Sequence, residues 1–363
     1  MQRGFSIYLD LVRFAAACLV YLTHSTVSPI VKVPLPLTGY GHSAVIIFFV
    51  LSGFVIAHVV ETKESDWRRY AAGRFARIYS VVVPALVLTL LLDTAGRMIA
   101  PEYYKLPYDH FAVRFFAALG MVNEIWFISI SPFSNFPYWS IAYEFWYYVI
   151  FGLAMLAPGR WRWAAVALIA LVLGPKIVLM MPIWLSGVLL YRWRWWQTLS
   201  LPVAAALVVL SVAAGLWLHA VESMGAIAGW LRPLIGDWLH HELAYSRHFL
   251  ADYLLCICVW LNFAGMRIVA ARIAPLFERI ESPVRWAAGL TFTLYAIHNP
   301  VLLFWATVVR PDPTGRIGWV TITVLTAATV IVVGQFTEKR RHTMRRFLLD
   351  RLQRGRAPQV QAA

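Results

Sequence analysis

The sequence contains a series of apolar segments of membrane-spanning length, and this feature constrains the fold more than any other. A transmembrane helix needs about 20 predominantly apolar residues. Charged residues make up only 14% of the chain, whereas they form about one quarter of a soluble domain. We therefore expect an all-α polytopic membrane helical bundle of about ten transmembrane helices, at 7–27, 42–60, 78–97, 137–157, 161–174, 176–192, 198–219, 248–265, 287–309 and 316–336.

The distribution of Lys and Arg between the loops predicts the orientation of this bundle. With the N-terminus in the cytoplasm, the expected inside loops carry 22 of these residues and the expected outside loops carry 9. Positive charge accumulates on the cytoplasmic side of membrane proteins, so both termini are expected to be cytoplasmic. The net charge of +14 is attributed to topology and not to nucleic-acid binding. We expect a membrane domain over 1–336 and a basic cytoplasmic tail over 337–363.

Three ionisable residues interrupt the first apolar segment: Asp10, Arg13 and His24. Eleven residues separate Arg13 from His24, which is almost three helical turns, so the two side chains share a face about 16 Å apart along the axis. Asp10 lies one turn before Arg13 and is placed to neutralise its charge. A charged group inside a membrane helix costs about 2.5–3.5 kcal/mol and usually faces the bundle interior. The stripe indicates a polar-lined tunnel; the alternative is a structural Asp10–Arg13 pair with His24 at the interface.

Two further motifs occur near the second and third segments. Ser52 and Gly53 are small residues among bulky apolar ones, so another helix or a ligand chain can approach closely there. No base is evident beside Ser52 in the sequence. Arg74 and Arg77 are three residues apart and therefore share a helical face at the cytoplasmic mouth. Such a pair suits bidentate phosphate binding, but ordinary positive-inside charge explains the spacing equally well.

The fourth segment carries one acidic residue, Glu144, one turn beyond Ser140. An ionisable residue in a membrane helix indicates function by default, and Arg13 and His24 are candidate partners. A structural hydrogen bond is the alternative. Trp139 and its aromatic neighbours suit stacking on a sugar or an interfacial aromatic belt.

The ninth segment carries Tyr295 and His298 one turn apart, before Pro300, which loosens the helix by removing a donor. A buried histidine bonded to a carbonyl is the alternative interpretation. We expect no metal site. The three cysteines all lie in apolar segments, and the polar loop with His240, His241, Glu242 and His248 is read as an exposed loop.

In this order, the segments resemble the acyltransferase-3 family of integral membrane O-acyltransferases, which modify bacterial surface glycans and related acceptors. The resemblance runs from Asp10 to about Pro300 and depends on five motifs. These are Arg-x10-His (Arg13 and His24), Phe-Phe-x-Leu-Ser-Gly-Phe (48–54), Arg-x-x-Arg (Arg74 and Arg77), Trp-Ser-x-x-x-Glu (139–144) and Leu-Tyr-x-x-His-x-Pro (294–300). Thr291 and Thr293 depart from the family, which more usually has Ser-Tyr or Gly there.

The resemblance implies transfer of an acyl group, usually acetyl, from cytoplasmic acyl-CoA to a hydroxyl of an extracytoplasmic glycan or similar acceptor. It implies His24 as catalytic base, supported by Glu144 and Arg13. The residues expected to bind acyl-CoA are Arg74, Arg77, Ser52 and Gly53. Those expected to contact the acceptor or support catalysis are Asp10, Tyr295, His298, Trp139 and Ser140.

The expected donor is acetyl-CoA, as a substrate, with no permanently bound cofactor. The expected location is the bacterial inner membrane. A lipid-linked saccharide is one form of the acceptor, and the enzyme is expected to act alone, as a homo-oligomer or with a separate periplasmic partner. The main alternative function is a transporter or flippase, in which Asp10, Arg13, His24 and Glu144 form a proton or substrate path. A non-catalytic scaffold for glycan synthesis is a third.

Overall fold

The computed structural model describes residues 1–26, 30, 35–223, 225–312 and 314–354, and within them the chain is helical and has no strand. Val27 of the first expected span and residues 355–363 of the expected tail lie outside this described part. The α-helices are α1 (Arg3–Ser25), α2 (Gly41–Thr62), α3 (Trp67–Ile99), α4 (Phe111–Leu119), α5 (Trp139–Leu156), α6 (Trp161–Leu173), α7 (Pro175–Arg192), α8 (Leu201–Ser223), α9 (Ala226–Ile235), α10 (Asp237–Glu242), α11 (Phe249–Arg272), α12 (Ala274–Arg279), α13 (Glu281–Ala288), α14 (Thr291–Val309), α15 (Ile317–Thr337) and α16 (Arg341–Arg354). Short 3-10 turns connect them at η1 (Pro101–Tyr103), η2 (Phe136–Tyr138), η3 (Trp195–Thr198), η4 (Ala244–His248) and η5 (Glu338–Arg340).

Every expected span overlaps one of these helices, which confirms the all-α membrane bundle. Seven helical stretches in the described residues are long and apolar enough to cross a bilayer; they contain α1, α2, α3, α8, α11, α14 and α15. Helices α5 and α7 have 18 residues each and are not among the seven. Helix α6 has only 13 residues, about 20 Å at a rise of ~1.5 Å per residue, which is shorter than the ~30 Å hydrocarbon core.

Helix α3 begins well before the expected start of its span at 78. The side chain of Asp66 accepts hydrogen bonds from the backbone N–H groups of Arg68 and Arg69, at 3.2 and 3.3 Å, and so caps the helix. Because α3 starts at Trp67, Arg74 and Arg77 lie within a helix of 33 residues and not in a loop. Both guanidinium groups are therefore fixed to one rigid element.

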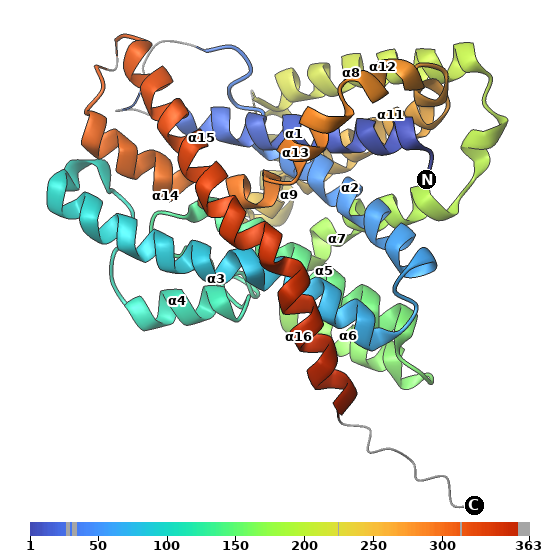
Figure 1. The fold of residues 1–363 in the computed structure, drawn as a ribbon, viewed down its shortest axis with the longest axis horizontal. Coiled ribbons are helices and arrows are strands. Elements are labelled where there is room, and N and C mark those ends of the chain that lie inside the picture. The colour runs from blue at the N-terminus through green and yellow to red at the C-terminus, as the bar shows by residue number, and fades with distance from the viewer. Residues whose placement is uncertain (27–29, 31–34, 224, 313, 355–363) are drawn as a thin grey trace, which may run out of the picture.

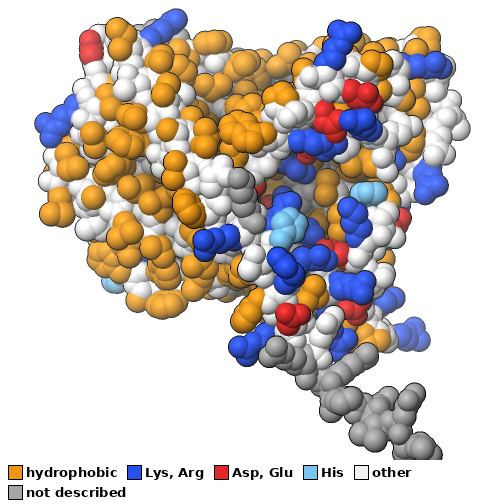
Figure 2. Space-filling view, viewed as in Figure 1, with side chains coloured by type: hydrophobic (Ala, Val, Ile, Leu, Met, Phe, Trp, Pro, Cys, Tyr) orange, Lys and Arg blue, Asp and Glu red, His pale blue; other side chains and the backbone are white. Residues whose placement is uncertain are grey.

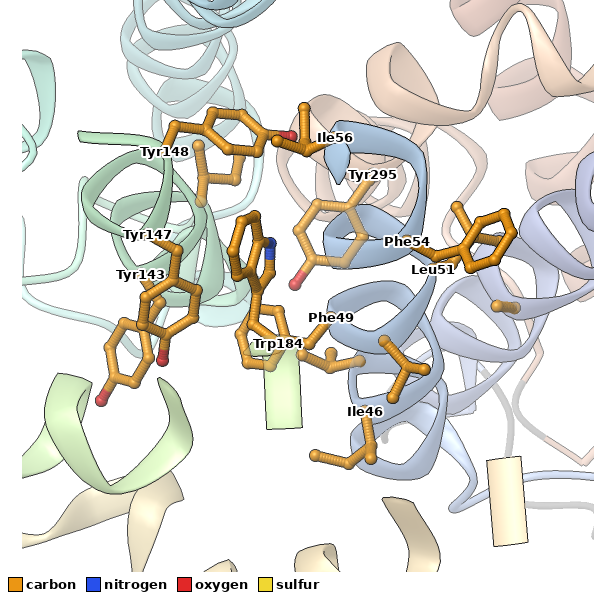
Figure 3. Close-up of a cluster of buried hydrophobic side chains, with 14 of the residues drawn as sticks. Ile46, Phe49, Leu51, Phe54, Ile56, Tyr143, Tyr147, Tyr148, Trp184 and Tyr295 are labelled. Carbon is orange, nitrogen blue, oxygen red and sulfur yellow. The ribbon is translucent and has the colours of Figure 1, made fainter. Parts of the chain in front are cut away.

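Helices α2 and α7 approach each other closely at two glycines. A Cβ atom at Gly53 would lie 1.9 Å from the carbonyl oxygen of Trp184, and one at Gly187 would lie 2.0 Å from the carbonyl oxygen of Val50. Only glycine fits at both positions. The contact buries Trp184 completely, and Figure 3 shows its indole between Tyr147 and Tyr148 of α5 and Phe49 of α2.

The C-terminal helices lie across the bundle. In Figure 1, α15 and α16 follow one another along a diagonal in front of α3. Helix α14 packs between α3 and α15, and α16 packs on α3. Arg345 of α16 forms an ion pair of 3.3 Å with Glu64, just before α3. The described part of the C-terminal segment therefore lies against the membrane bundle.

Candidate active site

A cavity between α1, α2, α3, α5 and α14, here called the central cavity, combines three arginines with apolar walls. It encloses about 660 Å³, including the part open to solvent. Its polar lining consists of Arg13, Ser52, Arg74, Arg77, Ser140, Glu144, Tyr148, Thr291 and Tyr295. The remaining lining is apolar and includes Val45, Phe48, Phe49 and Phe292. Seven of the candidate site residues named from the sequence thus meet here, from five different helices.

A second cavity, here called the basic cavity, adjoins the first and shares Arg13, Arg77, Thr291 and Phe292 with it. Its other lining residues are Asp10, Ser80, Arg285, Ala288, Gly289, Glu338 and Arg341. The volume is about 710 Å³, again including space open to solvent. Arg285, Glu338 and Arg341 are functional candidates that the sequence analysis missed, because they appeared there only as positive-inside charge or as part of the tail.

Asp10 neutralises Arg13, as the helical spacing predicted. Arg13 Nη1 donates to Asp10 Oδ1 at 3.2 Å, and Arg285 Nη1 donates to Asp10 Oδ2 at 2.8 Å. Arg285 also bonds Glu281 at 2.7 Å. Bonds from Arg3 and Arg285 hold the pKa of the Glu281 carboxyl below its usual value. The Asp10 carboxylate therefore pairs with two arginines, one on α1 and one on α13.

Arg74 and Arg77 lie on one face of α3, as expected, but their surroundings differ. Arg74 Nη2 donates to Glu64 Oε2 at 3.2 Å, and its guanidinium lies 5.7 Å from the ring centre of Tyr148. Arg77 lines both cavities and, within the described residues, has no carboxylate within 4.0 Å. Arg77 is thus the more available of the two for an added anion.

Glu144 hydrogen bonds to hydroxyl groups and not to Arg13 or His24, the candidate partners named from the sequence. Ser52 Oγ donates to Glu144 Oε1 at 2.7 Å, and the Tyr148 hydroxyl donates to the same oxygen. Trp184 Nε1 donates to Ser52 Oγ at 3.1 Å. The sequence showed no base beside Ser52, because the carboxylate that it contacts comes from α5, 92 residues later in the chain.

Gly53 and Trp139 lie outside the lining of the central cavity. Gly53 packs against the α7 backbone, which supports close helix approach as the reason for a small residue there. Trp139 stacks on Tyr245 at 4.5 Å between ring centres and lies 6.3 Å from the ring of His42. His42 in turn bonds Asp252 at 2.9 Å, and these two residues had not been singled out because 210 positions separate them.

The His and Glu side chains of the polar loop near α10 do not converge on one point. His248 bonds Glu222 at 2.9 Å, whereas His241 bonds its neighbour Glu242 at 3.4 Å. Within the residues that the structure describes, no group of three or more His, Cys, Asp and Glu side chains is arranged to hold a metal ion.

His24 and His298 form a hydrogen-bonded pair outside the lining of the central cavity. His24 Nδ1 lies 2.7 Å from His298 Nε2. His298 Nδ1 lies 2.8 Å from the carbonyl oxygen of Tyr295 and 3.2 Å from that of Leu294. A carbonyl oxygen only accepts, so His298 carries its proton on Nδ1 and the Nε2 of the neutral ring is an acceptor. His24 then donates from Nδ1, and its Nε2 keeps a lone pair.

A contact between α5 and α14 lines the central cavity next to this histidine pair. The hydroxyls of Ser140 and Tyr295 hydrogen bond to each other, and that of Tyr295 also donates to the carbonyl of Pro137 at 3.1 Å. Both side chains line the central cavity, whereas His24 and His298 do not. His298 follows Tyr295 by one turn, with 6.0 Å between the ring centres.

Comparison with known proteins gives one match. A family model described as an acyltransferase domain, that of the acyltransferase-3 family, matches residues 6–335. No match is found among curated proteins or among solved structures.

Proposed function

This chain belongs to the acyltransferase-3 family and is a membrane acyltransferase, and from this premise we propose that it transfers an acetyl group from cytoplasmic acetyl-CoA to a hydroxyl of an extracytoplasmic glycan in the bacterial inner membrane. A thioester is already activated. The protein must therefore position it, remove the proton of the acceptor hydroxyl and stabilise the oxyanion that forms. Each of the first two tasks has a matching group of residues.

The central cavity suits the donor. Arg74 and Arg77 are the candidates for the CoA phosphates, since guanidinium groups form paired hydrogen bonds with phosphate oxygens. The walls beyond them, at Val45, Phe48 and Phe49, are apolar and suit an acyl-pantetheine arm. In this proposal the arm extends from the arginines towards the Ser140–Tyr295 contact.

His24 is the proposed general base. Its Nε2 lone pair takes the proton of the acceptor hydroxyl as the oxygen attacks the thioester carbonyl. The tetrahedral intermediate then collapses, the carbon–sulfur bond breaks, and His24 returns the proton to the thiolate, which leaves as CoA thiol. His298 is a positioning residue here, because it accepts from His24 Nδ1 and so holds the required tautomer.

Transfer by this route requires Ser140 and Tyr295 to separate. Their hydroxyl contact lines the cavity assigned to the donor, and Tyr295 lies one turn before His298, which is outside that lining. Opening it would place the thioester within reach of His24. Transfer through a transient acyl-histidine would need the same opening, because the acyl group has to reach the same nitrogen.

The single observation that carries the proposal is the hydrogen-bond order from the Tyr295 carbonyl through His298 to His24. The test measures release of CoA thiol from acetyl-CoA by the purified protein in lipid vesicles, with and without a saccharide acceptor. We expect acceptor-dependent release with the natural chain and none with His24→Gln. In cells, deleting the gene should remove an acetyl ester from a surface glycan and leave the amount of that glycan unchanged. Release that does not depend on an acceptor hydroxyl would contradict the proposal.

A further inference from the structure

The segment that follows α15 borders the basic cavity, although the family match ends at residue 335. Glu338 in η5 and Arg341 at the start of α16 both contribute to the cavity lining. Figure 2 shows basic side chains gathered around a hollow near the junction of α15 and α16. The C-terminal segment therefore forms part of a cavity wall whose other residues lie within the family domain.

Two polar contacts hold this segment in place. Glu338 Oε1 accepts from the backbone N–H of Thr293 at 2.8 Å and from its hydroxyl at 3.1 Å, which attaches η5 to α14. The Glu64 carboxylate, which is 6% exposed, pairs with Arg345 of α16 at 3.3 Å and with Arg74 of α3 at 3.2 Å. Arg341 lies between these two contacts along the chain and is held at the edge of the basic cavity.

Some of the arginines that line the basic cavity have a carboxylate partner among the described residues and others do not. Asp10 pairs with both Arg13 and Arg285. Within the described residues, no carboxylate lies within 4.0 Å of the guanidinium of Arg77 or of Arg341. Two guanidinium groups on different elements thus face one cavity without an ion-pair partner. Such an arrangement favours a ligand with more than one phosphate group.

We propose that the C-terminal segment completes the donor site, with Arg341 and Arg77 binding the phosphate groups at the nucleotide end of acyl-CoA in the basic cavity. This inference rests on the proposed acyl-CoA donor. The pantetheine arm then enters the central cavity where the two cavities share Arg13 and Thr291. Arg74, already paired with Glu64, contributes less than Arg341 does. An anionic lipid headgroup offers the same phosphate chemistry, so the test separates the two sources.

The test compares two acetyl donors in the full-length protein: acetyl-CoA, and acetyl-pantetheine, which has the same thioester and no nucleotide. We expect Arg341→Gln to raise KM for acetyl-CoA about tenfold or more, the loss expected for a charge-assisted hydrogen bond, with kcat unchanged. Its turnover of acetyl-pantetheine should equal that of the natural chain, which also shows that the variant folds. Arg346→Gln is the matched control, since Arg346 is exposed on the same helix and outside the cavity lining.

Three results would overturn the inference, and they differ in what they say about the proposed function. If Arg341→Gln and Arg346→Gln have the same KM for acetyl-CoA, Arg341 is not part of the donor site, and acyl-CoA can still be the donor. A KM effect that disappears when phosphatidylglycerol is omitted from the vesicles assigns Arg341 to a lipid headgroup. If the natural chain releases no CoA thiol with any hydroxyl acceptor, both the proposed function and this inference are wrong.

Discussion

His24 Nδ1 lies 2.7 Å from His298 Nε2, although 274 residues separate the two histidines in the sequence. The backbone carbonyls on the other side of His298 fix its proton on Nδ1, so the direction of the bond between the rings follows. The two histidines have unequal roles in this arrangement. His24 presents a free lone pair, and His298 presents an acceptor to His24.

Glutamine should therefore be tolerated less well at His24 than at His298. His24→Gln removes the proposed base and is expected to lower kcat by about 10²–10⁴-fold. His298→Gln keeps an oxygen that can accept from His24 Nδ1 and should retain more activity than His298→Leu, which cannot accept. The measurement is kcat for each purified variant at saturating acetyl-CoA. Equal activities for His298→Gln and His298→Leu would contradict the positioning role, and a half-active His24→Gln would move the base to another residue.

Replacing the arginines of α3 should affect donor binding more than turnover. Arg77→Ala and Arg74→Ala are expected to raise KM for acyl-CoA with little change in kcat, because a phosphate contact far from the thioester contributes uniformly to ground and transition states. Arg77→Ala should have the larger effect, since Arg74 already pairs with Glu64. Lysine should restore binding only in part, because it lacks the bidentate fork. Unchanged acyl-CoA affinity in the double alanine variant would exclude both residues from the donor site.

Removing the carboxylate of Glu144 should lower the stability of the folded protein. It accepts hydrogen bonds from Ser52 and Tyr148, and Glu144→Ala would leave both hydroxyls without that acceptor, at a cost of about 1–3 kcal/mol each if they stay unsatisfied. Glu144→Gln keeps an acceptor oxygen and should lose less. The measurement is the thermal unfolding temperature of each variant in detergent. If Glu144→Ala has the same unfolding temperature as the natural chain but is inactive, the carboxylate acts only in catalysis.

Gly53→Ala should weaken the packing of α2 on α7. The added Cβ atom would lie 1.9 Å from the carbonyl oxygen of Trp184, and forcing the backbones apart typically costs about 1–3 kcal/mol. Gly229→Ala is the matched control, because a Cβ atom there meets nothing within 4 Å. We expect a lower melting temperature for the first variant and no decrease for the second. Equal melting temperatures would mean that the two helices separate at no cost.

The orientation of the bundle can be tested with two tag insertions. Gly236, between α9 and α10, belongs to an expected outside loop, and Gly159, between α5 and α6, to an expected inside loop. We expect a tag at Gly236 to react with an impermeant label on intact cells, and a tag at Gly159 to react only after permeabilisation. The reverse pattern would invert the positive-inside assignment.

Properties that depend on local spacing could be predicted from the sequence. Apolar segments of bilayer length predicted the membrane helices, because water-free surroundings leave a helix as the simplest way to satisfy the backbone. The three-residue steps from Asp10 to Arg13 and from Arg74 to Arg77 predicted side chains on a shared face, because an α-helix repeats every 3.6 residues. The order of five motifs indicated the family that the match over 6–335 shows.

Which of these side chains meet depends on the packing of the helices and could not be predicted from local spacing. Glu144 bonds Ser52 of α2 and Tyr148 of its own helix, and not Arg13 or His24. Arg285 and Arg341 join the cavity walls from α13 and α16, where sequence spacing gave no hint of it. Periodicity fixes the face of one helix, whereas the pairing of faces depends on how the bulky and small side chains of different helices fit together. That fit placed His298 beside His24 and so selected the nitrogen that is free to accept a proton.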